Sequence, residues 1–436
     1  MGVMDANYIE ATYPIGFRED DSRILGEHLK LRHSVELVGA KRVGISNFLR
    51  FFLNNPKVVE TYINHGEKHL FVPVDLNDLV EVEIFPFWVL TFQRLVDVAE
   101  ENANFSEKTK KKLKELFSDS IQSRDVFLAV ENLRKGLGLI IAEDVKPTLF
   151  LLRFDRLETA VNPTFFNNLI GLKDSAAGKL AYVFTSFRAL DEISPKVFPR
   201  KLLSVFSHPM YLKPAQTPDV KIIFEAFERR YNLEPSKELE EEILRLCGGH
   251  IQYLHLSLIV LNQKLKDQDI EADELFETLL SDERIVSQSE EIWDSLTEGE
   301  RKILGMALKD QKLTEADKTE AKYLWDTGFL GGAKGNKIFS PLFERYLATV
   351  ASGQKQGDKV ELTKKENALY SYLLENEGEV CEREAIIEAV WPEIEDLGVS
   401  DWTIDRLVAR LRVKLKDQKS KYNIVTVKTR GYKLTS

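Results

Sequence analysis

The sequence of 436 residues has only two cysteines and no apolar run long enough to span a membrane. Cys247 and Cys381 lie far apart and neither belongs to a CxxC pair, which argues against a disulfide framework and a cysteine-based zinc site. A transmembrane helix would need about 18 consecutive apolar residues. The start MGVMDANYIEATYP has acids where a signal peptide needs a basic flank and an apolar segment. We therefore expect a soluble, cytoplasmic protein with no membrane contact.

Histidines in a metal-ligand pattern are also missing. His65 and His69 stand at i and i+4, but Gly66 between them favours a loop. We therefore predict no metal site. The composition, with 43% hydrophobic and 30% charged residues, excludes disordered and collagen-like classes. At about 100–200 residues per domain, the length predicts two to four domains.

An overall positive charge is absent as well, since the formal net charge is −10. This balance argues against a protein that coats nucleic acid over its whole surface. The charge is unevenly distributed, however. Residues 401–436 contain ten basic and three acidic side chains, a net charge of +7, whereas residues 361–400 contain three basic and eleven acidic ones, a net charge of −8. Such a change within one small domain indicates a face for an anionic partner.

The first 210 residues alternate short apolar runs with helix-like segments. The runs HSVELVG, HLFVPVDL, PTLFLLRF and AYVFTSF are typical of buried strands. Their alternation with helical patterns predicts an α/β domain with a parallel sheet over residues 1–210.

The second half of the chain is mainly helical. Residues 211–285 predict a helical lid subdomain, interrupted by Gly248-Gly249. Residues 286–350 predict three helices and a hairpin, an order that suits a winged-helix-like module. The polar stretch 351–359 is a candidate linker, and a separate domain is expected over residues 360–436.

A candidate phosphate-binding loop follows the first apolar run. Its sequence, GAKRVGIS over residues 39–46, has the spacing GxxxxG-x-S between a predicted strand and a predicted helix. In that context backbone N–H groups at a helix N-terminus cradle phosphates. The lysine that would neutralise the phosphates is replaced by Ile45. The candidate nucleotide-binding residues are Gly39, Lys41, Arg42, Gly44, Ser46 and Asp155.

Three interpretations of this loop stay open. It binds a nucleotide through backbone donors, it is only a tight strand-to-helix turn, or it belongs to an active NTPase in which Lys41 or Arg42 replaces the missing lysine.

Two further segments accompany the loop: YPIGFREDDSRILGEHLKLRHSVELVG before it and GGHIQYLHLSLIVL in the predicted lid. Together they resemble the AAA+/STAND class of P-loop NTPases over about residues 10–350. The resemblance implies a sheet domain, a helical lid, often a winged helix, and ATP or ADP as the candidate cofactor. Ser186 and His250 match a sensor position and a lid position of the class.

The pattern departs from the class at LFLLRFDR, residues 149–156. Arg153 stands where the class has magnesium-holding acids, and only Asp155 follows. This loss of charge disfavours bound magnesium and active hydrolysis. We therefore assign no catalytic residue.

The last part of the chain contains four motifs in order: LTKKENALYSYLLENEGEVCERE, AIIEAVW, TIDRLVARLRVKL and IVTVKTRGYKL. They resemble, almost from end to end, the winged helix-turn-helix domain of OmpR/PhoB-type response regulators over residues 361–436. In the third motif, the spacing i, i+4, i+7, i+11 predicts one buried stripe. Its members are Ile404, Val408, Leu411 and Leu415.

Basic residues on the opposite side of this helix and at the hairpin are the candidate DNA contacts. The resemblance implies contacts at Arg410, Arg412 and Lys428. Helix geometry adds Arg406 and places Lys414 beside the same outward face, and Arg430 joins Lys428 at the hairpin tip.

We predict a sequence-specific DNA-binding transcription regulator. Its degenerate STAND-like module would sense a ligand or nucleotide or mediate self-assembly. The expected partners are double-stranded DNA, a second copy of the chain on DNA, and RNA polymerase. The alternatives are an NTP-driven DNA machine or defence switch, and a scaffold whose winged helix contacts another protein.

Overall fold

The structure is a computed structural model that describes residues 8–64, 66–265, 271–352, 362, 364–391, 401–418, 420–427 and 430–436. The chain forms two compact units. Met1–Ile285 and Thr297–Glu344 make up the first, which we name the sheet unit. Val286–Leu296 and Arg345–Ser436 make up the second, the C-terminal unit. None of the helices within the described ranges is long and apolar enough to cross a membrane.

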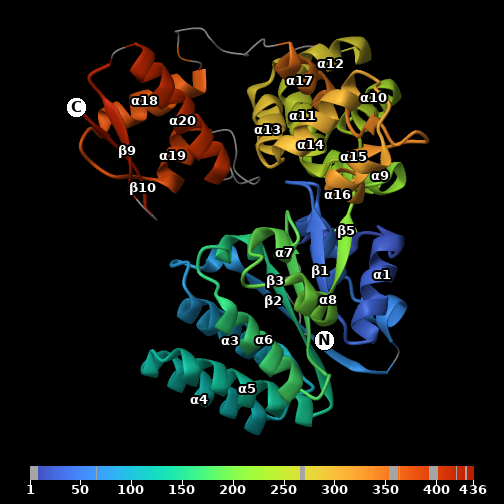
Figure 1. Ribbon diagram of the computed structural model, residues 1–436, viewed down its shortest axis with the longest axis vertical. Coiled ribbons are helices and arrows are strands. Elements are labelled where there is room, and N and C mark those ends of the chain that lie inside the picture. The colour runs from blue at the N-terminus through green and yellow to red at the C-terminus, as the bar shows by residue number, and fades with distance from the viewer. Residues whose placement is uncertain are drawn as a thin grey trace. The chain divides into compact units, whose positions relative to one another are not determined.

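Five parallel strands form the centre of the sheet unit, in the order β2-β3-β4-β1-β5 (Figure 1). The strands β1 and β4 are buried at every residue, as expected for parallel strands covered on both faces. The predicted parallel sheet is therefore confirmed. The strand bounds are β1 Ser34–Gly39, β2 Lys68–Asp75, β3 Val145–Leu152, β4 Ala181–Ser186 and β5 Ser207–Leu212.

Helices cover both faces of this sheet. The helices α3 to α6 lie on one side and α1 lies on the other (Figure 1). Aromatic side chains fill the core beneath α3 and α6, where the Phe87 and Phe165 rings meet edge to face at 5.1 Å between centroids. The helix bounds are α1 Glu19–Lys30, α2 Ile45–Asn54, α3 Ile84–Glu101, α4 Glu107–Ser123, α5 Val126–Ala142, α6 Pro163–Ser175, α7 Leu190–Ile193 and α8 Arg200–Phe206. Short turns occupy Ile9–Thr12, Val59–Ile63, Leu76–Asp78 and Phe154–Leu157.

After β5 the chain is helical apart from a small hairpin, and it begins with α9 to α12 in the region predicted as a lid. The parts of α13 from Val286 and of α17 from Arg345 belong to the C-terminal unit. The hairpin pairs Leu330 with Ile338 and turns at Gly335, whose φ is +69°. The lid helices are α9 Thr217–Tyr231, α10 Lys237–Cys247, α11 Ile251–Leu265 and α12 Ala272–Ser281. The following elements are α13 Glu283–Asp294, α14 Glu298–Leu308, α15 Glu315–Glu320, α16 Lys322–Asp326, β6 Leu330–Gly331, β7 Lys337–Ile338 and α17 Pro341–Ala351. The hairpin follows α16 and precedes α17, whereas three helices and then a hairpin were predicted over residues 286–350.

Three segments meet at the glycine pair between α10 and α11. A Cβ on Gly248 would lie 2.0 Å from the carbonyl oxygen of Phe339, and one on Gly249 would lie 2.1 Å from that of Ala215. Both glycines also have positive φ angles. The Ala215 N–H donates to the Gly249 carbonyl at 2.9 Å. These positions require glycine because backbone atoms occupy the space of any side chain.

The C-terminal unit contains a three-stranded antiparallel sheet in the order β8-β10-β9, together with three helices of the predicted winged helix. Their bounds are α18 Lys364–Glu375, β8 Cys381–Glu382, α19 Arg383–Val390, α20 Asp401–Asp417, β9 Asn423–Val427 and β10 Gly431–Thr435. The core joins all of these elements through residues such as Leu369, Ile386, Leu411 and Leu434, which are fully buried. The part of α13 from Val286 onward belongs to this unit.

Candidate nucleic-acid interface

The helix α20 has one buried side and one polar side. Ile404, Val408 and Leu411 have no exposed surface and Leu415 has 3%. The predicted stripe is therefore confirmed as the side that packs in the core of the C-terminal unit. Burying four such aliphatic side chains fixes the rotation of the helix, since each contributes about 1.5–3 kcal/mol.

The rotation turns Arg406 and Arg410 away from that core. In this conformation both guanidinium groups approach acids of α13 within the same unit. Arg410 Nη1 lies 3.4 Å from Glu290 Oε2, and Arg406 Nε lies 3.6 Å from the same oxygen. Arg406 Nη1 also lies 3.6 Å from Asp294 Oδ2. Their side chains keep 39% and 34% of their surface exposed. The predicted outward arginines are thus partly neutralised by acids that the sequence pattern did not indicate.

Arg412 and Lys414 bind groups of their own domain. Arg412 Nε donates to the Ile424 carbonyl at 2.9 Å and Nη2 donates to Thr426 Oγ1 at 2.8 Å, which joins α20 to β9. Lys414 does not lie on the exposed face that was predicted for it. Its Nζ is 2.6 Å from Glu366 Oε2, and the two side chains are only 13% and 2% exposed. A buried glutamate on α18 draws the lysine inward because an unpaired buried carboxylate would be costly.

The first residues of β10, directly after the hairpin turn, pair with β8. Arg430 is exposed, and its backbone N–H donates to the Val427 carbonyl at 3.1 Å. Lys428, the other predicted contact at the tip, lies outside the described residues. A Cβ on Gly431 would lie 2.0 Å from the Cys381 carbonyl oxygen, so glycine is required there.

A cluster of three polar side chains, Tyr432, Asp405 and Arg383, links the hairpin to α19 and α20, and the sequence pattern did not predict it. The Tyr432 hydroxyl donates to Asp405, and Arg383 Nη2 contacts Asp405 Oδ1 at 2.6 Å. Burial and the neighbouring Asp405 raise the pKa of Tyr432 to about 12. The tyrosine therefore stays protonated, and β10, α19 and α20 are held together. Only the Arg-Gly-Tyr order of the hairpin gave a hint of this arrangement.

The candidate phosphate loop joins β1 to α2 in the sheet unit, as predicted. Gly39 ends β1, and Gly44, with φ +116°, precedes the first residue of α2. A Cβ on Gly44 would lie 2.5 Å from Cγ1 of Ile251, so the start of α11 packs directly on the loop. His250 Nε2 donates to the Lys41 carbonyl at 2.9 Å. Burial lowers the pKa of His250 to about 4, so the imidazole is neutral at pH 7.

The charged residues around this loop contact different groups. Lys41 Nζ lies 3.8 Å from the centre of the Phe187 ring. Asp155 is half-buried, and burial raises its pKa in spite of the opposing influence of Lys41. Arg153, with φ +57°, forms an ion pair with Asp75, and its backbone N–H donates to Thr185 Oγ1 at 2.8 Å. A basic residue thus occupies the end of β3.

The remaining loop candidates are on the surface. Arg42 and Ser46 are exposed, and Arg42 has a left-handed φ of +63°. Ser186, the predicted sensor residue, is buried, and its hydroxyl donates to the Arg188 carbonyl at 2.5 Å. The strand, turn and helix of a phosphate loop are present. The charges that would polarise a magnesium-bound nucleotide are not assembled, because Ile45 is uncharged and Arg153 is basic and paired with Asp75, which leaves Asp155 as the acid at this place.

Comparison with known proteins assigns the C-terminal part of the chain. Residues 357–434 match the family described as "Transcriptional regulatory protein, C terminal". The transcriptional regulatory protein YxdJ of Bacillus subtilis is 35% identical over 79 residues, which are 18% of this chain and 34% of that protein. The chain therefore spans about a third of the length of this curated relative.

Solved structures are similar to parts of this chain at low sequence identity. The Walker-type ATPase of Pyrococcus abyssi has a TM-score of 0.47 and 16% identity, over 79% of this chain and 99% of that one. The ORC2 protein of Aeropyrum pernix has a TM-score of 0.43 and 11% identity, over 80% and 97%. The winged helix at the C-terminal end of this chain is thus similar to the C-terminal domain of transcriptional regulatory proteins, and it follows a unit built on a five-stranded parallel sheet.

Proposed function

We propose that this protein is a sequence-specific regulator that binds double-stranded DNA through its C-terminal winged helix and controls transcription in the cytoplasm. The observation that carries the proposal is the division of α20 into a buried aliphatic stripe and an opposite side bearing Arg406 and Arg410. The match to the transcriptional regulatory family and to YxdJ supports it.

The mechanism follows from the shape of the helix and the chemistry of arginine. An α-helix fits the major groove, where a guanidinium can bridge O6 and N7 of guanine, a contact worth about 1–3 kcal/mol of discrimination. Arg406 and Arg410 are the proposed base contacts. Arg412, two residues after Arg410, donates to the Ile424 carbonyl on β9, so we assign it a backbone or positioning role. Arg430 and Lys428 are the proposed phosphate or minor-groove contacts at the hairpin.

We propose that operator binding uses two chains. One winged helix offers a modest interface, and tight binding by such domains commonly needs two half-sites about one helical turn apart. RNA polymerase is the proposed protein partner of the bound regulator. A scaffold that uses the same surface for a protein would instead show no affinity for DNA that falls with salt.

For the sheet unit we propose a sensing or self-assembly role. The loop after β1 supplies backbone N–H donors at the start of α2, and the proposed contacts are Gly39, Lys41, Arg42, Gly44, Ser46 and Asp155. ATP and ADP are the probes to use. The residues present do not fit a magnesium-dependent hydrolase, because Ile45 replaces the lysine and Arg153 is paired with Asp75. We therefore propose binding at the loop and no hydrolysis.

The experiment is selection from a random duplex library by the full-length protein at near-physiological salt, with and without ATP. We expect recovery of one motif. ATP dependence of that recovery would support the loop as a sensor. Binding that depends on salt but not on sequence would contradict the regulator and leave the basic helix as a general DNA anchor.

The alternative, an NTP-driven DNA machine, is tested by phosphate release from purified protein with magnesium and ATP. We expect none above background. Turnover that Ser46→Ala abolishes would support the alternative, since Ser46 stands at the metal-holding position of the loop.

A further inference from the structure

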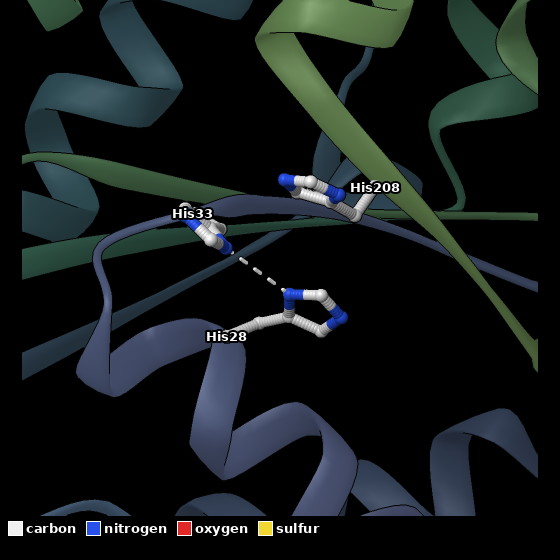
Figure 2. A group of neighbouring side chains, drawn as sticks. All are labelled: His28, His33 and His208. Atoms are coloured by element: carbon white, nitrogen blue, oxygen red, sulfur yellow. Dashed lines mark hydrogen bonds between the residues drawn. The ribbon is translucent and has the colours of Figure 1, made fainter.

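Three histidines that are separated in the sequence meet at one end of the sheet (Figure 2). His28 lies in the last turn of α1, His33 directly precedes β1, and His208 is the second residue of β5. The pairing of β1 with β5 places His208 beside Val35. The cluster is therefore at the N-terminal ends of these strands, whereas the phosphate loop follows the C-terminal end of β1.

The spacing of the ring nitrogens suits a shared ion. One nitrogen from each ring can be chosen so that all three lie within 4.8 Å of one another. His28 Nδ1 and His33 Nδ1 are 3.4 Å apart. That distance is long for an N–H···N hydrogen bond. It is close to the separation of about 3.3 Å between two ligands of a tetrahedral zinc ion with Zn–N bonds of about 2.0–2.1 Å.

Two of the three rings have pKa values shifted toward the neutral form. Burial, followed by the other two histidines, lowers the pKa of His28. Burial, followed by His208 and Lys173, lowers the pKa of His33. Neutral imidazole is the form that ligates a metal ion.

Lys173, whose charge acts on His33, donates to groups outside the cluster. Lys173 Nζ donates to Ser34 Oγ at 2.8 Å and to the Phe206 carbonyl at 3.3 Å. All three histidines are half-buried, so an ion can reach them from solvent and keep a fourth position for water.

We propose that His28, His33 and His208 form a binding site for a first-row divalent cation that prefers imidazole, with zinc as the expected ion. Bound metal would join α1 to the first residues of β1 and to the edge strand β5. The bound ion would then stabilise or regulate the sheet unit by linking these three segments. Spacing along the chain could not indicate it, since one ligand comes from a distant strand.

The test uses full-length protein stripped with a chelator and titrated with zinc alone by calorimetry. We expect one ion per chain and a higher melting temperature. The variant His33→Ala/His208→Ala should lose at least tenfold in affinity. The control is His69→Gln, a buried histidine on β2 outside the cluster, which should bind as the wild type does.

Cobalt gives a second readout that does not depend on stability. Visible absorption bands of a low-coordinate Co²⁺ site should appear with the wild type and be absent from the double variant. Equal zinc affinity of the wild type and the double variant, or no stoichiometric uptake by the wild type, would overturn the proposed site.

A second inference rests on the proposed function and on a different observation. Glu290 lies within 3.6 Å of both Arg406 and Arg410, and its side chain is only 15% exposed. The carboxylate takes up part of the donor edge of each guanidinium and offsets part of the positive charge that the two arginines would offer to DNA. We infer that α13 acts as an acidic latch that competes with DNA for the recognition helix.

The latch is tested by the DNA affinity of the full-length protein at low and moderate salt. Glu290→Gln should raise the affinity about three- to tenfold, and the gain should shrink as salt screens the pair. Glu283→Gln removes the same charge from an exposed position on α13 and should change little. Equal affinity of the wild type and Glu290→Gln would overturn the latch but leave DNA binding intact. Absence of DNA binding by both proteins would instead contradict the proposed function.

Discussion

Arg188 and Glu300 form a two-pronged ion pair inside the sheet unit. Both Arg188 Nη1 to Glu300 Oε1 and Nη2 to Oε2 measure 2.6 Å, and the side chains are 10% and 5% exposed. Arg188 follows β4 and Glu300 lies in the first turn of α14, where it also caps the helix through Thr297. The guanidinium packs over the Tyr323 ring at 3.7 Å. This pair therefore ties the sheet to the helices that follow the lid.

Removal of one partner should be strongly destabilising. Arg188→Ala leaves a buried carboxylate without its cation, for which we expect a loss of about 3–5 kcal/mol in the free energy of unfolding. Urea unfolding of the full-length protein, followed by circular dichroism, measures it. Arg23→Ala removes an exposed arginine of α1 and should hardly change the free energy of unfolding. A loss no larger than that of the control would show that the pair does not hold the elements together.

The same pair predicts a dependence of stability on acid. Burial alone would raise the pKa of Glu300, but hydrogen bonds and charge from Arg188 outweigh it, and the pKa is lowered. A carboxyl with a lowered pKa stabilises the fold above its unfolded value of about 4.3 and loses that contribution as the pH falls through its folded value. Glu300→Gln should therefore flatten the fall in stability below about pH 4. An unchanged acid profile would contradict this assignment.

At the hairpin, Gly431→Ala should weaken the C-terminal unit. The added Cβ would collide with the Cys381 carbonyl, so β8 and β10 must separate, at a cost of about 1–3 kcal/mol. The measurement is thermal unfolding together with DNA affinity, both of which should fall. Unchanged unfolding would mean that β8 is not held against the hairpin.

Arg410→Ala should reduce affinity mainly for the selected DNA sequence, by about tenfold, and hardly change binding to unrelated duplexes. The Glu290→Gln background is the one to use, because Arg410 also contacts that glutamate. Lys416→Ala, which removes an exposed cation of the same helix, should lower affinity for all sequences alike. Equal losses for Arg410→Ala on every sequence would reduce Arg410 to a phosphate contact.

Ile45→Lys restores the lysine of the phosphate loop but should not create hydrolysis. The end of β3 still carries Arg153 paired with Asp75, so magnesium and the attacking water remain without their acids. Phosphate release with magnesium and ATP measures the outcome. Turnover in this variant would show that the lysine alone was missing.

Local patterns predicted the elements well. Ile404 and Leu411 repeat with the helical period, and the short apolar runs around Val35 and Val183 have the composition of buried strands. Such signals depend only on neighbours in the chain, so no tertiary information is needed to interpret them.

The partners of the charged residues could not be predicted in this way. Lys414 turns toward Glu366 on another helix, and Arg410 meets Glu290 from a segment far upstream. His208 joins His28 only because β5 pairs with β1. Each of these contacts depends on packing between distant segments, which residue spacing does not encode.

The glycine pair between α10 and α11 has a consequence for dissecting the protein. Gly248 packs against the backbone at Phe339, after the hairpin, and Gly249 packs against the backbone at Ala215, after the edge strand β5. The three segments therefore contact one another through backbone atoms, with no side chain between them. A fragment that stops after α12 would lack Phe339, so Gly248 and the helices beside it would be exposed to water. Shortening the sheet unit from its C-terminal side should therefore produce insoluble material, whereas a fragment that ends after α17, at Ala351, keeps Phe339 and the whole of that helix.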